Sequence, residues 1–505
     1  MKKVLIIVAL MLVSTALFVS VSVFNKQNDS SNSHSSSQTS TDIVTDTVTS
    51  NITEYPNPTS SLTFISSENS SSEVSSLVSS NTSSATSSAT SSQTSSAVSS
   101  ETSSETSSAT SSATSSATSS ESVSSQATSS ETTSSQTPPI TVQTDETRAI
   151  WISYIELTTM LSGKTKSQFV SNFTTACENV KEMGLNTVIV HVRPFSDALY
   201  ESSYFPWSHI VTGTQGKTPS FDPLEEMVKI AHNNSLKIEA WINPYRITTG
   251  GNSISTDNPA YRWTGTDMVV AVGNGKYYNP AYSQVQDLIV DGVREIVENY
   301  DVDGIHFDDY FYPTTEESFD ATAYAEYKNN GGNLSLADFR RQNVTDLVRK
   351  VYNAVKEVDS SVTFGISPQG NNQTNYNSQY VDVKTIIKNG YIDYICPQIY
   401  YGYNHSSCPY EQTVSEFNSY VKGTNVKLYI GLAAYKIGTT DKWAGSGKDE
   451  WLDTTDILKR QVLSAREYSN YNGFSIYTYS SFFYTDPSLK SQMETELENL
   501  KSILK

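Results

Sequence analysis

The sequence predicts an α/β fold, a (β/α)8 TIM barrel that follows a long non-globular N-terminal region. Eight short apolar runs rich in β-branched residues recur between residues 146 and 480, which is typical of buried strands. Longer segments with the apolar period of a helix alternate with them. Eight such units in about 360 residues match the barrel, whereas a doubly wound sheet would normally show a Gly-rich turn after its first strand.

The first element, residues 1–25, is predicted to be a membrane anchor or a signal peptide. Lys2 and Lys3 precede an uncharged run from Val4 to Phe24, which as a helix would reach about 31 Å, close to the thickness of a bilayer core. No A-x-A cleavage pattern follows, which favours an anchor that attaches the chain to the membrane. Either alternative predicts an extracytoplasmic protein, secreted or anchored to the cell membrane or cell surface.

Residues 26–140 are predicted to be a disordered linker. Repeats such as "SSATSSATSSQTSSAVSS" dominate this segment and hold too few apolar residues to bury a core. As a flexible coil it would span roughly 60 Å on average, against a contour of roughly 390 Å. The linker therefore suits a stalk that holds the folded domain away from a membrane.

Residues 146–505 are predicted to form the barrel. Asp222 and Pro223 are a plausible N-cap and first residue for a helix over Asp222–Asn233, and apolar residues at helical spacing predict a second helix over Tyr282–Asn299. The eight predicted strands are "RAIWISY" from Arg148, "TVIVHVRP" from Thr187, "LKIEAWINP" from Leu236, "VDGIHFDDYF" from Val302, "VTFGISP" from Val362, "IDYICPQIYY" from Ile392, "KLYIGLAAYK" from Lys427 and "GFSIYTYSS" from Gly473.

Charge and cysteine content exclude several classes of protein. A formal net charge of −19 and a pI near 4.8 argue against a nucleic-acid partner, which would require a basic face. The three cysteines, Cys177, Cys396 and Cys408, show no CxxC pattern and no disulfide framework. Buried free thiols are favoured over a Cys396–Cys408 pair, and no metal or cofactor is expected.

The stretch "HFDDYFYP" marks the candidate catalytic position. Asp308 and Asp309 end the fourth predicted strand, and barrel enzymes carry their chemistry at the C-terminal ends of the strands. Because side chains alternate along a strand, His306 and Asp308 share one side, and Asp309 takes the other unless the strand bends. A lone aspartate there would often be a cap or an arginine partner, but an adjacent pair followed by Tyr310 favours catalysis.

The other strand ends carry amides, aromatic rings and a few charges, as a polysaccharide-binding site requires. Rings stack on the apolar faces of sugars, and amides bond to hydroxyl groups. His191, Trp241 and Glu239 lie within strands and are expected in the barrel core. The predicted substrate-binding residues are Arg193, Asp197, Asn243, Tyr245, Arg246, His306, Tyr310, Gln369, Gln398, Tyr400, Tyr435 and Lys436.

The chain resembles the bacterial glycosyl-hydrolase-like family 10 over nearly all of residues 146–480. The resemblance implies a secreted TIM-barrel glycoside hydrolase, and members of the family have been linked to peptidoglycan glycan strands stripped of their peptides. Phe339 before "RRQNV" and Tyr401 after "PQIY" stand where the family usually has Trp, which affects expected sugar contacts rather than the fold. The motifs that carry it are "ETRAIWIS", "HVRPFSDALYESSYFPWS", "FDPLEEMVKIAH", "EAWINPYRI", "YYNPAYSQV", "DVDGIHFDDYFYP", "FGISPQG" and "YIDYICPQIYYGY".

Two catalytic routes are open to these residues. In the first, one aspartate of the pair works with a carboxylate from another strand, for which Asp197 and Glu156 are the candidates. In the second, the 2-acetamido oxygen of the sugar is the nucleophile. This substrate-assisted route is favoured because other acids are scarce. By analogy with other acetamido-sugar hydrolases, Asp308 is predicted to orient the amide and Asp309 to be the acid/base.

The cations suggest a substrate that carries a carboxylate. Arg193, Arg246 and Lys436 follow strands in a strongly acidic chain, and one of them could bind the lactyl carboxylate of muramic acid. The alternative for Arg193 is an ion pair with Asp197. A function of another class also stays open, namely a non-catalytic glycan-binding module on a stalk, for which a paired acid is unnecessary.

Overall fold

A computed structural model describes residues 145–250 and 254–504. The two segments predicted at residues 1–25 and 26–140 lie outside the described residues. In the described part, no helix is both long and apolar enough to cross a bilayer.

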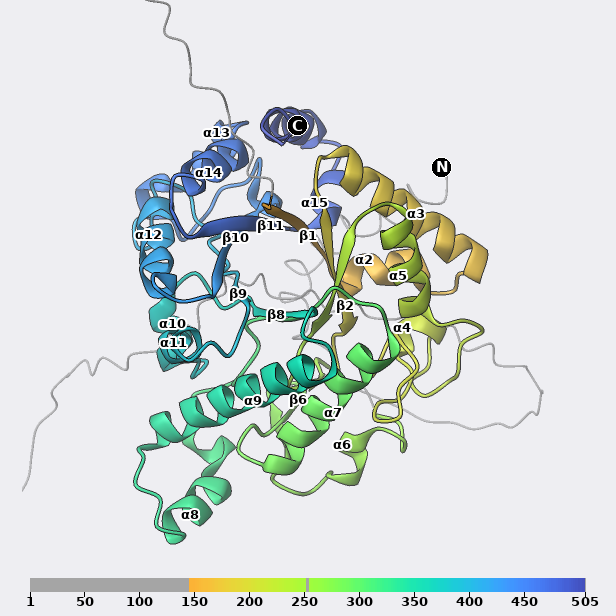
Figure 1. The fold of residues 1–505 in the computed structure, drawn as a ribbon, viewed down its shortest axis with the longest axis vertical. Helices are drawn as coiled ribbons and strands as arrows, with labels where there is room; N and C mark the ends of the chain where they lie inside the picture. The colour runs from red at the N-terminus through yellow and green to blue at the C-terminus, as the bar shows by residue number, and fades with distance from the viewer. Residues whose placement is uncertain (1–144, 251–253, 505) are drawn as a thin grey trace, which may run out of the picture. The chain divides into compact units, whose positions relative to one another are not determined.

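Eight parallel strands close into a barrel, which confirms the predicted fold class (Figure 1). The strands lie in chain order around the barrel, and β11 pairs with β1 to close it. Each of the eight predicted apolar runs overlaps one strand, and β1 and β11 begin one and two residues before their runs. The strands are β1 (Thr147–Ile152), β2 (Thr187–Arg193), β3 (Lys237–Ile242), β7 (Gly304–Phe307), β8 (Thr363–Ile366), β9 (Tyr394–Ile395), β10 (Lys427–Ala433) and β11 (Tyr471–Tyr477).

Helices surround the barrel on its outside (Figure 1). Asp222 caps α5 by accepting a hydrogen bond from the Glu225 N–H at 3.1 Å, with Pro223 at the start of the helix, as predicted. The longer helices are α3 (Lys166–Glu182), α5 (Pro223–Asn233), α7 (Ser283–Asn299), α9 (Leu336–Val358), α12 (Tyr410–Val421), α14 (Ile457–Ala465) and α16 (Lys490–Lys501).

Shorter elements belong mainly to the connections between strands and helices. A three-stranded sheet of order β4-β6-β5 interrupts the connection from β3 to α7. These elements are α2 (Tyr154–Leu161), α4 (His209–Thr212), α6 (Pro259–Arg262), α8 (Ala321–Asn329), α10 (Asn372–Asn377), α11 (Val383–Lys388), α13 (Glu450–Asp453), α15 (Tyr479–Phe483), β4 (Arg246–Thr248), β5 (Val269–Val272), β6 (Gly275–Tyr278), η1 (Glu317–Phe319), η2 (Ala434–Lys436) and η3 (Gly445–Gly447).

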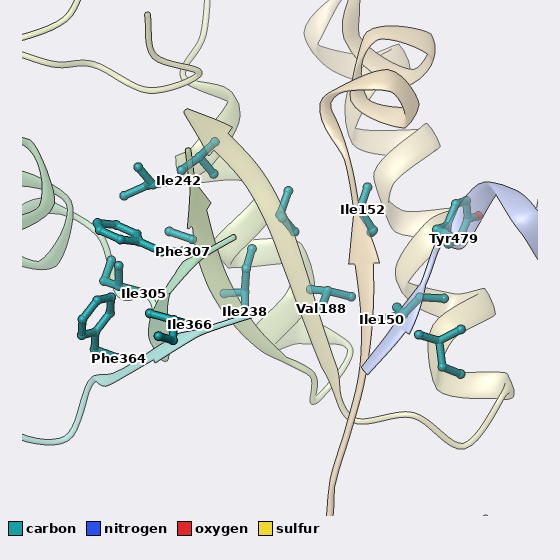
Figure 2. Packing of buried hydrophobic residues seen from close by; sticks show 14 of the residues in the cluster. Ile150, Ile152, Val188, Ile238, Ile242, Ile305, Phe307, Phe364, Ile366 and Tyr479 are labelled. Atoms are coloured by element: carbon teal, nitrogen blue, oxygen red, sulfur yellow. The ribbon is translucent and has the colours of Figure 1, made fainter. Parts of the chain in front are cut away.

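Alternation along the strands divides the core into two layers. Outward residues such as Ile150, Val188 and Ile305 belong to the large cluster that packs between strands and helices (Figure 2). The inward residues form a separate cluster inside the barrel: Ala149, Trp151, Ile189, Trp241, Tyr394, Cys396 and Tyr429. The barrel interior is therefore filled by large rings, and the residues above them in the same inward series stand at its C-terminal mouth.

A glycine in β8 makes room for one of these rings. A Cβ atom on Gly365 would lie 2.1 Å from the ring of Tyr394, far inside van der Waals contact. The three cysteines are free, and Cys177 and Cys396 are buried, in agreement with the favoured prediction.

Candidate active site

Asp308 and Asp309 stand together at the mouth of the barrel. Strand β7 ends at Phe307, and Asp308 continues the inward series of Gly304 and His306. A bend at Asp309 directs the second carboxylate toward polar groups of the following strands. Both side chains are buried, with 3% and 4% of their residue surface exposed. The exception made for a bend in the strand therefore applies here, because the strand ends at Phe307 and the chain bends at Asp309.

Asp308 accepts its hydrogen bonds from the β3 side and from its own turn. Trp241 Nε1 and Asn243 Nδ2 donate to Oδ2 at 2.9 Å and 3.3 Å, and the Tyr310 N–H donates to Oδ1 at 3.2 Å. Burial, together with the negative charge of Asp309, raises the pKa of Asp308 from 3.8 to about 7. Asp308 therefore holds a proton far more readily than an ordinary aspartate.

Asp309 is surrounded by three side-chain amides. Gln398 Nε2 donates to Oδ1 at 2.8 Å, and the Nε2 atoms of Gln369 and Gln379 each donate to Oδ2 at 3.2 Å. Donors that converge on a carboxylate stabilise its negative charge. Each carboxylate thus accepts from three N–H donors, and it is the raised pKa of Asp308 that favours the opposite division of roles from the one predicted: Asp308 carries the proton and Asp309 carries the charge.

Two of the three amides, those of Gln398 and Gln369, are themselves held in place. Gln398 uses its Nε2 to donate to the Ser367 carbonyl as well, at 2.9 Å. The backbone of Gln369 is bracketed by the Asn375 amide, whose Oδ1 accepts from Gln369 N–H at 2.9 Å and whose Nδ2 donates to Gln369 O at 2.8 Å. Because the donors are fixed by the surrounding backbone, they require little reorganisation when charge develops at Asp309.

Aromatic rings and one cation lie beside the pair. Tyr400, Tyr435 and Tyr477 contact one another, with ring centroids 5.8–6.0 Å apart. The Arg246 guanidinium lies 5.1 Å from the centre of the Tyr310 ring, and its positive charge opposes the rise in the pKa of Asp308. The structure thus brings together around the aspartates five of the predicted residues: Asn243, Arg246, Tyr310, Gln369 and Gln398.

His306 lies beneath the site, inside the barrel. Its Nε2 accepts from Trp151 Nε1 at 3.2 Å, so its Nδ1 carries the hydrogen and donates to the Tyr394 hydroxyl at 2.7 Å. Tyr394 in turn donates to Glu239. Burial lowers the pKa of His306 to about 3 and raises that of Glu239 to about 7. His306 was predicted to contact substrate, but the structure places it in a buried polar network with no exposed surface.

Several other predicted site residues make their contacts away from the aspartate pair. Arg193 is buried over the ring of Phe205, with its Cζ 4.2 Å from the ring centre, and Tyr245 is completely buried. These two predictions were wrong because both side chains face packed core rather than the mouth. Lys436 Nζ is buried and donates to Asp441 Oδ2 and to the Tyr400 carbonyl, each at 2.7 Å.

The two alternative catalytic carboxylates are also engaged away from the pair. Asp197 accepts hydrogen bonds from His209 and Gln215 at 3.1 Å and 2.9 Å, and does not pair with Arg193. Glu156 is part of the capping box of α2 and accepts from the Thr478 hydroxyl at 2.7 Å. Each therefore has a structural role in holding a helix or a loop.

Two residues at the site escaped prediction from sequence. Trp241 was expected in the barrel core, and it is buried there, but its indole N–H reaches Asp308. The sequence feature that could have identified Trp241 as a site residue is its position two residues before Asn243, in the inward series of β3. Gln379 lies in the loop after α10, where no strand end marks it. In the described ranges, no group of three or more His, Cys, Asp or Glu side chains could hold a metal ion.

A closed parallel barrel with buried carboxylates and amides at its C-terminal mouth defines a TIM-barrel hydrolase of the glycosidase type. Residues 146–446 match the family model for glycosyl hydrolase-like 10, and the chain belongs to this family. It is a glycoside hydrolase, and its substrate is a carbohydrate. The alternative of a non-catalytic glycan-binding module loses its support.

Two sequence relatives of known name agree with this assignment. The chain is 35% identical to the glycosyl hydrolase YngK of Bacillus subtilis (strain 168), over 70% of this chain and 72% of that protein. It is 33% identical to the glycosyl hydrolase DigH of Escherichia coli (strain K12), over 56% and 70%. It also resembles the solved PgaB (BpsB) glycoside hydrolase domain from Bordetella bronchiseptica, at 14% identity and a TM-score of 0.47, over 70% of this chain and 99% of that one.

Proposed function

We propose that the enzyme cleaves N-acetylated cell-wall glycan outside the cytoplasm, and that the 2-acetamido group of the sugar is its nucleophile. One observation carries this mechanism. Asp308 and Asp309 lie side by side and are held by different donors, whereas Asp197 and Glu156, the carboxylates predicted for a two-carboxylate route, are bonded elsewhere. A pair of adjacent carboxylates suits the substrate-assisted route, which needs an acid and a charge but no protein nucleophile.

In this proposal each aspartate has its own role. Asp308 donates its proton to the leaving glycosidic oxygen while the acetamido oxygen attacks the anomeric carbon and the C–O bond breaks. Asp309 orients the acetamido N–H and stabilises the positive charge that develops on the cyclic intermediate. Water then attacks the anomeric carbon, Asp308 takes its proton, and the acetamido group is restored. The configuration is retained because the anomeric carbon is inverted twice.

The proposed substrate is the peptide-free glycan strand of peptidoglycan. An extracytoplasmic location, predicted from the apolar run at residues 4–24 and the Ser/Thr-rich segment, brings the enzyme to this polymer. Arg246 is the one of the three predicted cations whose charge acts on the catalytic pair. A cation there suits a sugar that carries a carboxylate, as muramic acid does once its peptide is removed.

A comparison of acetylated and de-N-acetylated glycan oligomers of equal length tests the mechanism. The purified enzyme should bind both but cleave the de-N-acetylated oligomer far more slowly, because the nucleophile is missing. Products identified by mass spectrometry report the bond cleaved. Equal rates would exclude the acetamido route and return the choice to a protein carboxylate. Cleavage of other N-acetylated polymers but not of denuded peptidoglycan would refute the substrate while leaving the mechanism intact.

A further inference from the structure

Two loops flank Asp309 at the barrel mouth. One follows β7 and runs through η1 to Asp320, and the other follows β8 and runs through α10 to Tyr380. The second loop supplies two of the three amides that bond to Asp309, from Gln369 and Gln379. The position of these donors therefore depends on what holds the two loops together.

A single buried guanidinium joins both loops. Arg340, in α9, is completely buried. Its Nε and Nη2 donate to the carboxylate of Asp320 at 2.9 Å and 2.6 Å. It also donates to the carbonyls of Thr315 and Glu316 at 3.1 Å and 2.6 Å, and to the Tyr380 hydroxyl at 2.9 Å. These bonds use all five N–H groups that an arginine offers.

Tyr380 carries this link to the catalytic carboxylate. It follows Gln379, whose Nε2 donates to Asp309. Its φ of 57° lies in the left-handed region, which a residue other than glycine seldom adopts without support from its surroundings. The support includes the hydroxyl bond to Arg340 and an edge contact with the Tyr312 ring, at 5.2 Å between ring centres.

The energetics indicate a role in geometry rather than in stability or charge. A buried ion pair loses much of its attraction to desolvation, and apolar residues of similar volume often stabilise a protein as well. Asp320 also neutralises the charge of Arg340 directly. The remaining distinctive property of this guanidinium is that its rigid fork fixes two loops at set distances.

We propose that Arg340 is a positioning residue that holds Gln379 against Asp309 through the hydroxyl of Tyr380. This inference rests on the proposed role of Asp309 as the charged member of the pair. Loss of the link lets Gln379 withdraw, so that one of three donors to Asp309 is weakened. The chemical step slows, while binding of the sugar changes little.

A double-mutant cycle between Tyr380 and Gln379 tests the link. Tyr380→Phe removes only the hydroxyl bond to Arg340, and kcat should fall about tenfold, the usual scale for one lost hydrogen bond to a charged group, with KM within about twofold. Gln379→Ala should cost a similar factor, and the double variant no more than Gln379→Ala alone. Tyr312→Phe is the matched control: it removes only the hydroxyl that accepts from Asn343 Nδ2 at 3.2 Å. It leaves in place the ring contact with Tyr380 and the backbone bond from the Tyr312 N–H to the Gln379 carbonyl. Its effect should be small and additive with Gln379→Ala.

The split between kcat and KM separates positioning from a structural defect. Tyr380→Phe and Gln379→Ala should lower kcat and leave KM within about twofold, whereas Tyr312→Phe should change neither by more than about twofold. Arg340→Lys should behave like Tyr380→Phe. Arg340→Met leaves Asp320 buried without its partner, so the double variant Arg340→Met with Asp320→Leu is measured beside it. This double variant should show the same split.

Additive effects of Tyr380→Phe and Gln379→Ala, or equal effects of the two tyrosine variants, would overturn the proposal. The measurement uses any glycan that the wild-type enzyme cleaves. Failure to cleave N-acetylated glycans refutes the proposed function, whereas an additive cycle in an active enzyme refutes the positioning role alone.

Discussion

Replacing each aspartate of the pair by asparagine separates the acid from the charge. Asp308→Asn removes the group that carries the proton, so turnover of a glycan with a poor leaving group should fall by about 10²–10⁴-fold, the usual loss for a positioned acid. An activated aryl glycoside needs no protonation of its leaving group. With that substrate, the loss in the first step should shrink to within about tenfold. Asp309→Asn should be slow with both substrates, by about 10²-fold or more, because charge stabilisation is needed whatever the leaving group.

The size of the pKa shift sets the pH dependence. A pKa of about 7 in place of 3.8 for Asp308 corresponds to about 4 kcal/mol in favour of the protonated form, at about 1.36 kcal/mol for each pH unit. The acid form is therefore lost as the pH rises through 7, and kcat on the poor leaving group should fall about tenfold per pH unit above that value. The activated substrate should lack this alkaline limb.

Initial rates on the two substrates, from pH 5 to 9, check both expectations. Asp301→Asn is the control, since it places the same substitution just before the other end of β7, where the carboxylate is 94% exposed. If the activated substrate rescues Asp309→Asn and leaves Asp308→Asn slow, the roles are those predicted from the sequence. If neither substitution slows turnover, the pair is not catalytic.

Three further predictions concern the surroundings of the pair. Asp308→Asn should be more stable than the wild type at pH 8 by at most about 4 kcal/mol, because the folded-state pKa is raised. Between about pH 4 and 7 the folded state binds more protons than the unfolded state, so the stability of the wild type falls as the pH rises through this window. Near pH 4 the wild type and Asp308→Asn should therefore have equal denaturation midpoints. A stability difference that does not change with pH would contradict the raised pKa of Asp308. Trp241→Phe removes the indole donor to Asp308, so the alkaline limb of kcat should move to higher pH and turnover should fall by about tenfold; an unchanged limb in a folded variant contradicts the contact. Gly365→Ala should lower the free energy of unfolding by about 3 kcal/mol or more, because the added Cβ would meet the Tyr394 ring. Gly250→Ala is the control, since Gly250 has open space around it, and it should leave the thermal midpoint unchanged. Equal midpoints for the two variants would contradict the packing of the barrel interior.

The strands could be predicted because parallel strands in a barrel are buried on both faces. Each strand therefore appears in the sequence as an almost continuous apolar run. The charged or amide residues that follow such a run mark the mouth of the barrel. Asn243, Gln369 and Gln398 were found in this way. Their side chains continue the inward series of β3, β8 and β9, and all three donate hydrogen bonds to the aspartates.

The wrong predictions come from places where the chain leaves the strand pattern. The register between β2 and β3 shifts between His191 and Arg193, which turns Arg193 away from the inward series. Tyr245 lies between β3 and the start of β4 at Arg246, and its carbonyl accepts from the Tyr278 N–H at 2.8 Å. Periodicity of two applies only while a strand continues, so neither departure is visible in the local sequence.

The division of labour within the pair depends on contacts that are remote in sequence. Gln369, Gln379 and Gln398 lie 60, 70 and 89 residues from Asp309, and the position of Gln379 is a consequence of loop packing. From the sequence, the glutamines at the strand ends mattered because an amide cannot serve as an acid. In the structure these glutamines have a further effect, because the N–H groups of their amides donate hydrogen bonds to the Asp309 carboxylate. Asp308 also accepts from three N–H donors, so the number of donors does not divide the roles. Burial and the charge of Asp309 raise the pKa of Asp308, which favours the proton on Asp308. Two chemically identical side chains are thus made different by their surroundings.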